Sequence, residues 1–100
     1  MTRQDVLILI GEIPKAHGVF DQIQEPRRRV YCQVRSVGYN EFYQARSHGL
    51  NPTFVFVLSD VAEYKNEKIC EYNGTRYRIV RTYVDRQRIE LTVEEATVDG

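Results

Sequence analysis

Histidine and cysteine, which often serve as metal ligands or nucleophiles, are few in this sequence, and its plentiful carboxylates form no recognisable acid–base pair or ion-binding loop. Its histidines are His17 and His48, and its cysteines are Cys32 and Cys70. A zinc site or an activated nucleophile needs several such groups together, and neither histidine has a Cys, Asp or His at ligand spacing. We therefore expect surface histidines and free thiols, with Cys32 buried as a small apolar residue. We expect no catalytic site, no metal and no other cofactor, and hence no enzyme.

Phosphate binding is the other chemistry that the residue types would allow. Three arginines stand together at 27–29, and further arginines and tyrosines follow at Tyr72, Arg76, Tyr77, Arg78, Arg81 and Tyr83. Aromatic residues among arginines are one sign of single-strand nucleic-acid binding on a small barrel. However, 14 basic residues balance 14 acidic ones, whereas nucleic-acid binders are usually basic. The arginines at 76 and 78 also alternate with apolar neighbours, as on an outward strand face. A nucleic-acid-binding module therefore remains the alternative hypothesis.

Short runs of strand-forming residues, separated by turn residues, would have to position these side chains. We predict strands at 6–10, 30–37, 53–58, 67–72, 75–83 and 88–94. The dipeptide Asn73-Gly74 predicts a type I′ hairpin turn, and residues 85–87 predict a second turn. The spacing of strands and turns is typical of a small barrel or sandwich. We expect one domain over residues 1–100, mainly β, forming a small antiparallel β-barrel of about six strands.

The segment at 36–50 has a helical rather than a β pattern. Asn40 is a favourable N-cap, Glu41 suits the first turn, and Gly49 suits the position after the last turn. We therefore predict one short α-helix in the long loop between strands two and three. So short a helix is marginal alone, and contacts with the barrel or a neighbouring subunit must order it. Residues 15–29 have no periodicity and predict an irregular loop.

Length and composition are ordinary for a soluble globular domain, with 100 residues, 42% of them hydrophobic and 28% charged. No run is long and apolar enough to span a membrane. The apolar run at 6–10 is too short for a signal peptide, so we expect a protein that is made and kept in a cytoplasm.

An ordered series of segments resembles a known protein family. It consists of 6–10 (VLILI), 30–34 (VYCQV), 41–45 (EFYQA), 54–58 (FVFVL), 68–74 (KICEYNG), 77–80 (YRIV) and 89–92 (IELT). Over residues 30–95 this series resembles the head–tail joining, or head-closure, family of tailed bacteriophages, and the leading segment at 6–10 also fits. The likeness is greatest to the stopper-type head completion proteins, which close the DNA channel.

The resemblance implies a virion structural protein that forms a ring below the portal or adaptor protein. Such a ring closes the DNA channel after packaging and provides the surface to which the tail attaches. The implied partners are copies of the chain in a ring, expected to be dodecameric, the portal or adaptor above, a tail protein below, and genomic DNA transiently in the channel. No membrane is involved, and the host cytoplasm holds the protein before assembly. A tail-side adaptor or terminator is the alternative role within this class.

In proteins of this type the long loop between the second and third strands reaches into the channel, and here that loop is 38–52. The resemblance therefore implies that the channel-loop and ring contacts are made by Tyr39, Asn40, Glu41, Phe42, Tyr43, Gln44, Arg46 and His48.

Overall fold

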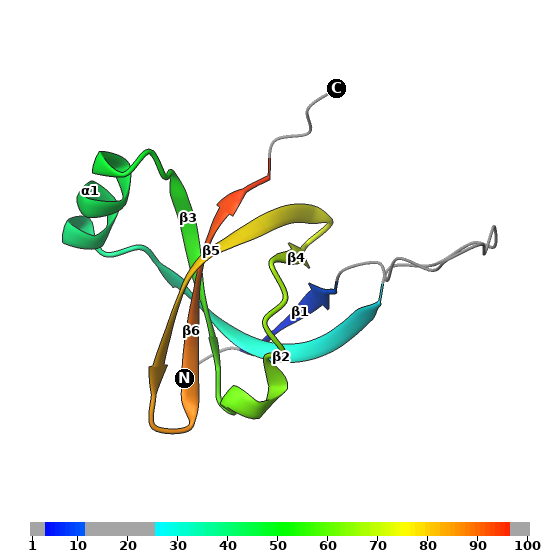
Figure 1. Cartoon of the computed structure of the whole chain (residues 1–100). Coiled ribbons are helices and arrows are strands. Elements are labelled where there is room, and N and C mark those ends of the chain that lie inside the picture. Colours follow the sequence, from blue (N-terminus) through cyan, green and yellow to red (C-terminus); the bar gives the residue numbers. More distant parts are fainter. Residues whose placement is uncertain (1–3, 12–25, 97–100) are drawn as a thin grey trace, which may run out of the picture.

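Six antiparallel strands close into a barrel in the computed structural model, which describes residues 4–11 and 26–96 (Figure 1). Around the barrel the strands follow the order β1-β2-β3-β6-β5-β4. The elements are β1 (Asp5–Ile10), β2 (Arg27–Ser36), α1 (Tyr39–Ser47), β3 (Pro52–Leu58), the 3₁₀ turn η1 (Val61–Glu63), β4 (Ile69–Tyr72), β5 (Thr75–Asp85) and β6 (Arg88–Glu95). The prediction of a mainly β barrel with a short helix between strands two and three is confirmed.

The barrel interior is filled by alternate residues of each strand. Leu7 and Leu9 of β1, Phe56 and Leu58 of β3, and Leu91 of β6 are fully buried in one cluster. Period-two alternation places every second side chain on the inner face, which explains why the cluster draws on all six strands. Burial of this apolar surface is the main term that stabilises the fold.

Both cysteines belong to this core, as predicted for Cys32. Burial, with the nearby Asp5 carboxylate, raises the pKa of the Cys32 thiol to about 12. Burial, with Cys32 nearby, likewise raises the pKa of the Cys70 thiol to about 12. Both side chains are therefore protonated, apolar groups at neutral pH and have no nucleophilic thiolate.

Two neighbouring strands are buried on both faces. All residues at 55–58 in β3 and at 91–94 in β6 are buried, including the polar Thr92 and Glu94. The inner face of these strands packs in the core, and on the outer face Glu41 and Asn51 of the connection that carries α1 contact Thr92 and Glu94. A strand that is covered on both faces reads as a continuous apolar run, which is what TFVFVL shows.

The turns follow the local sequence. Asn73 and Gly74 both have positive φ, 52° and 79°, so the type I′ prediction between β4 and β5 is confirmed. Arg86 (φ 60°) and Gln87 form the turn between β5 and β6, within the predicted second turn. The strand before this turn, β5, continues to Asp85 and is therefore longer than the predicted strand at 75–83.

The prediction of a loop at 27–29 was wrong. These three arginines are the first residues of β2, where Arg27 pairs with Ile10 and Arg29 with Ile8 of β1. The apolar strand β1 needs hydrogen-bonding partners, and this requirement outweighs the poor strand pattern of three consecutive arginines. The remainder of that predicted loop, at 15–25, and His17 lie outside the described residues.

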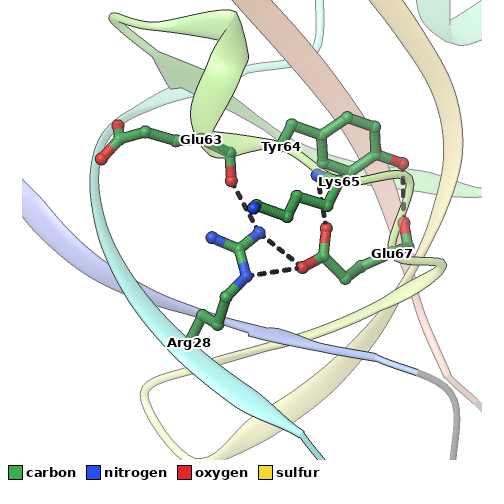
Figure 2. A network of polar contacts seen from close by, with 5 residues as sticks. All are labelled: Arg28, Glu63, Tyr64, Lys65 and Glu67. Carbon is green, nitrogen blue, oxygen red and sulfur yellow. Dashed lines mark hydrogen bonds and ion pairs between the residues drawn. The ribbon is translucent and has the colours of Figure 1, made fainter.

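The inward-facing Arg28 forms a polar network at the end of the barrel (Figure 2). Its Nε and Nη2 donate to Glu67 Oε2 at 3.0 and 2.5 Å, and Nη2 also donates to the carbonyl of Glu63 at 2.7 Å. The other carboxylate oxygen of Glu67 accepts the N–H of Lys65 at 2.8 Å, and the Glu67 carbonyl accepts the hydroxyl of Tyr64 at 2.6 Å. These bonds tie β2 to the segment between η1 and β4.

This network also determines where β4 begins and how Glu67 titrates. The strand predicted from residue 67 starts only at Ile69, because the Glu67 side chain turns inward to meet Arg28. Burial alone would raise the pKa of Glu67. The hydrogen bonds from Arg28 and from the backbone outweigh burial, so this pKa lies below its usual range.

Candidate functional site

The connection between β2 and β3 projects from the barrel and carries α1 (Figure 1). The helix begins after Gly38, which is extended (φ −67°, ψ 154°) and makes no side-chain cap. The prediction of Asn40 as N-cap was wrong, because Asn40 is already the second helical residue. Starting at Tyr39 lets the Phe42 N–H reach the Gly38 carbonyl at 2.8 Å, which closes the first turn without a capping side chain.

The end of the helix follows the sequence signal. His48 is the C-cap residue and Gly49 adopts positive φ (78°), so the predicted role of Gly49 is confirmed. The N–H groups of Gly49 and Leu50 donate to the carbonyls of Arg46 and Ala45, each at 3.0 Å. These bonds satisfy the last carbonyls and turn the chain back toward β3.

One face of the connection is fixed to the barrel. Ala45 is buried, and Thr92 Oγ1 of β6 donates to Glu41 Oε2 at 3.4 Å. At the other end of the connection, the Asn51 N–H donates to Glu94 Oε1 at 2.9 Å. The helix is therefore held at two points on the outer face of the β3–β6 pair.

The opposite face carries a pair of tyrosines. Tyr39 is 76% exposed and Tyr43 57% exposed. They lie one helical turn apart, with ring centroids 4.9 Å apart in an edge-to-face arrangement and hydroxyl oxygens 3.3 Å apart. Because the two rings already contact each other, they would lose little side-chain freedom when a partner covers them. Exposed tyrosines of this kind are typical centres of protein interfaces.

The predicted contact residues divide into two groups. Exposed residues are Tyr39, Asn40, Tyr43, Gln44, Arg46 and His48, whereas Glu41 and Phe42 are half-buried. His48 is held locally, with Nδ1 2.9 Å from the Gln44 carbonyl oxygen. Arg46 donates to Asn51 Oδ1 at 3.3 Å. The structure thus brings the exposed group together on one short helix and its cap, and assigns Glu41 to anchoring.

Sequence reasoning missed Glu94 as a member of this site. It is only 6% exposed, and Arg78 of β5 donates to its Oε2 while Asn51 donates to its Oε1. The hydrogen bond from Arg78, and then that from Asn51, hold the pKa of Glu94 below its usual range despite burial. The alternation of RIELTVE places this carboxylate on the outer face, but no local signal shows that Asn51 and Arg78 meet it there.

Three of the six arginines considered for phosphate binding pair with carboxylates. Arg28 binds Glu67, Arg78 binds Glu94, and Arg27 Nη1 lies 3.2 Å from Glu71 Oε1. The aromatic residues between them are also engaged, since Tyr77 is buried in the core beside Phe54 and Phe56 and Tyr72 packs against the same rings. These contacts leave this part of β5 with little of the stacking surface that single-stranded nucleic acid uses.

Within the part of the chain that the structure describes, no three His, Cys, Asp or Glu side chains are grouped for metal binding. In the same residues, no helix has the length and apolar character needed to cross a membrane. No family model matches the chain, and no curated protein matches it.

Proposed function

We propose that this chain is a virion structural protein of a tailed phage, of the stopper-type head completion class. It forms a ring below the portal or adaptor, closes the DNA channel after packaging and offers the surface for tail attachment. The observation that carries the proposal is the projecting connection between β2 and β3, which presents Tyr39 and Tyr43 on a helix fixed at its base to a barrel. The resemblance of residues 30–95 to head-closure proteins supports the class.

The division between a closed barrel and a projecting helix suits a ring subunit. Subunits of a cyclic ring contact each other through two different surfaces, so each needs a stable body and a distinct contact element. The barrel supplies the body, because its six strands pair in a closed order. The helix supplies the contact element, because its outer face is aromatic at Tyr39 and Tyr43 and polar around them.

The contact element can also line a channel. Asn40, Gln44, Arg46 and His48 are exposed on or beside the helix, and none of them is held by an ion pair with the barrel. Polar side chains of modest charge allow transient contact with DNA without the tight phosphate binding that an arginine cluster would give. The proposed channel surface therefore fits a gate better than a nucleic-acid-binding site.

The direct test is deletion of the gene from the phage genome. We expect packaged heads that lose their DNA and tails that remain unattached, with infectivity restored by the gene supplied in trans. Normal infectious particles in the deletion strain would refute the proposal.

A second experiment separates a stopper from a tail-side adaptor or terminator. A single cysteine introduced at Tyr39 or His48 can carry a cross-linker, and the native Cys32 and Cys70 do not compete because they are buried. A stopper is expected to form cross-links from these positions across the lumen and to DNA in filled heads. Cross-links exclusively to tail proteins would instead assign the chain to the tail side.

A further inference from the structure

The strand β5 has an open edge near its end. It pairs with β4 only over Thr75–Arg78, and beyond that point it pairs with β6 alone as far as Asp85. Among the described residues, no strand lies on the other side of the stretch from Val80 to Asp85. Figure 1 shows this end of β5 as the outermost strand beside β6 and β3.

The register of the hairpin identifies the backbone groups on this edge. In a two-residue hairpin the residues that flank the turn form a hydrogen-bonded pair, and bonded pairs then alternate along the strands. Asp85 is opposite Arg88, so Asp85, Tyr83 and Arg81 bond to β6. The N–H and C=O groups of Thr82 and Val84 therefore point away from β6, toward the open side.

Large and charged side chains lie along this edge and are exposed. Tyr83 is 58% and Val84 52% exposed, which places them among the most exposed large apolar side chains of the described residues. Neither Arg81 nor Asp85 makes an ion pair within the part of the chain that the structure describes. An open strand edge that carries exposed apolar side chains can pair with another strand, and stable proteins usually protect it.

We propose that the open edge of β5 binds the same edge of a second copy of this chain, antiparallel, about a two-fold axis at Tyr83. In this register Thr82 and Val84 exchange backbone hydrogen bonds with Val84 and Thr82 of the partner subunit. Arg81 lies opposite Asp85 of the partner subunit, and the symmetry produces this ion pair twice. The two Tyr83 rings meet at the axis, as a directly opposed aromatic pair.

The charges select this register over its neighbours. A slip by two residues preserves the backbone bonding pattern, but it moves the axis to another residue and places Arg81 opposite an uncharged side chain. A slip by one residue would bring groups that already bond to β6 onto the shared edge. The axis at Tyr83 is therefore the arrangement that satisfies both the open backbone groups and the two unpaired charges.

The edge is bordered by a hollow near Val80. A hollow of about 280 Å³ lies along the same edge, between Val80–Thr82 of β5 and the segment that includes Tyr64, Asn66 and Lys68. In the proposed register, the β5–β6 turn of the partner subunit lies opposite Val80, at the mouth of this hollow.

This contact is independent of the proposed ring. A two-fold contact closes at two copies, whereas a ring needs two different complementary surfaces. The contact also uses β5 and leaves α1 uncovered. Pairing of one strand buries a small area, so we expect a weak dimer of the free protein.

The test is the oligomeric state of the purified full chain by sedimentation velocity from about 10 μM to about 1 mM, a range suited to weak association. The wild type is expected to shift from monomer to dimer across it. Arg81→Glu and Asp85→Arg each place like charges opposite each other twice, and each should weaken the dimer about tenfold. The double variant Arg81→Glu/Asp85→Arg restores opposite charges and should regain wild-type association.

Two controls make the result specific. Arg29→Glu reverses an exposed charge on β2, which does not pair with β5, and should leave association unchanged. In the wild type, amide hydrogen exchange at Thr82 and Val84 should slow as protein concentration rises. A wild type that stays monomeric throughout, or a double variant that does not recover association, would overturn the proposal. If the wild type forms the dimer but assembles into no ring, the result would count against the proposed function alone.

Discussion

The backbone N–H of Asn51 donates to Oε1 of Glu94 at 2.9 Å, while Arg78 donates to the other oxygen of the same carboxylate. This buried carboxylate therefore joins the end of the α1 connection to β5 across β6. It fixes the position from which the helix projects, so the geometry of the proposed contact element depends on it.

Removing this carboxylate should destabilise the barrel and loosen the connection. Glu94→Ala leaves the Asn51 N–H without its acceptor, and we expect the free energy of unfolding to fall by about 1–3 kcal/mol. Urea unfolding followed by circular dichroism measures the change. Glu95→Ala is the matched control, because Glu95 is exposed, and a loss as large in this control would contradict the assigned role.

In the network of Figure 2, replacing one partner of the Arg28–Glu67 pair should reduce the free energy of unfolding more than replacing both. Arg28→Met leaves the Glu67 carboxylate buried without its cation, and we expect a loss of about 3 kcal/mol. The double variant Arg28→Met/Glu67→Met should recover part of it, because it removes the unpaired charge. Arg29→Met, at the exposed neighbour, serves as the control in the same urea titration. Equal losses in the control and in Arg28→Met would show that Arg28 has no special role.

Both buried carboxylates predict acid sensitivity. The pKa values of Glu67 and Glu94 are lower in the folded protein than in the unfolded chain, so the folded state binds fewer protons. The stability they contribute is complete above the ordinary carboxyl pKa of about 4.3 and is lost as the pH falls through the lower folded values. Urea unfolding across this range gives the free energy of unfolding at each pH. The slope of this free energy against pH should be smaller in Glu67→Gln and in Glu94→Gln. An unchanged slope in both variants would refute this assignment.

The two thiols predict the opposite pH dependence. The folded pKa of Cys32 and of Cys70 is about 12, above the value of about 8.5 for a free thiol. The stability they contribute is complete below the free value and is lost as the pH rises toward the folded value.

At neutral pH, a thiol reagent should therefore react with either cysteine only through unfolding, with a rate that rises with urea. Rapid labelling of the native protein without urea would contradict this.

The exposed tyrosines should matter for assembly and not for folding. Tyr39→Ala and Tyr43→Ala remove solvent-exposed rings, so the free energy of unfolding should change by no more than about 0.5 kcal/mol. The same variants, supplied to the deletion strain, should fail to restore infectivity. Tyr31→Ala is the control, since Tyr31 is 64% exposed on the barrel wall, away from α1. Full complementation by the Tyr39 and Tyr43 variants would remove the helix from the proposed contact.

Much of the fold could be predicted because its signals are local. Alternating residues predict the strands, Asn73-Gly74 predicts its turn through the positive φ at both positions, and Gly49 predicts the helix end. These signals act over a few residues, so they remain readable without knowledge of the tertiary structure. The N-cap is a local feature that was nevertheless wrongly predicted, because Gly38 precedes a turn that closes without a side-chain cap.

The sequence by itself determined the strands, the turns, the short helix and the buried Cys32. The tertiary structure alone decided that 27–29 forms a strand, that Arg28 meets Glu67, and that Glu94 receives the end of the α1 connection. Each of these outcomes joins residues far apart in the chain. A periodic pattern can assign a charged residue to a face but cannot identify its partner, which only barrel closure brings near; the same arrangement leaves the end of β5 open.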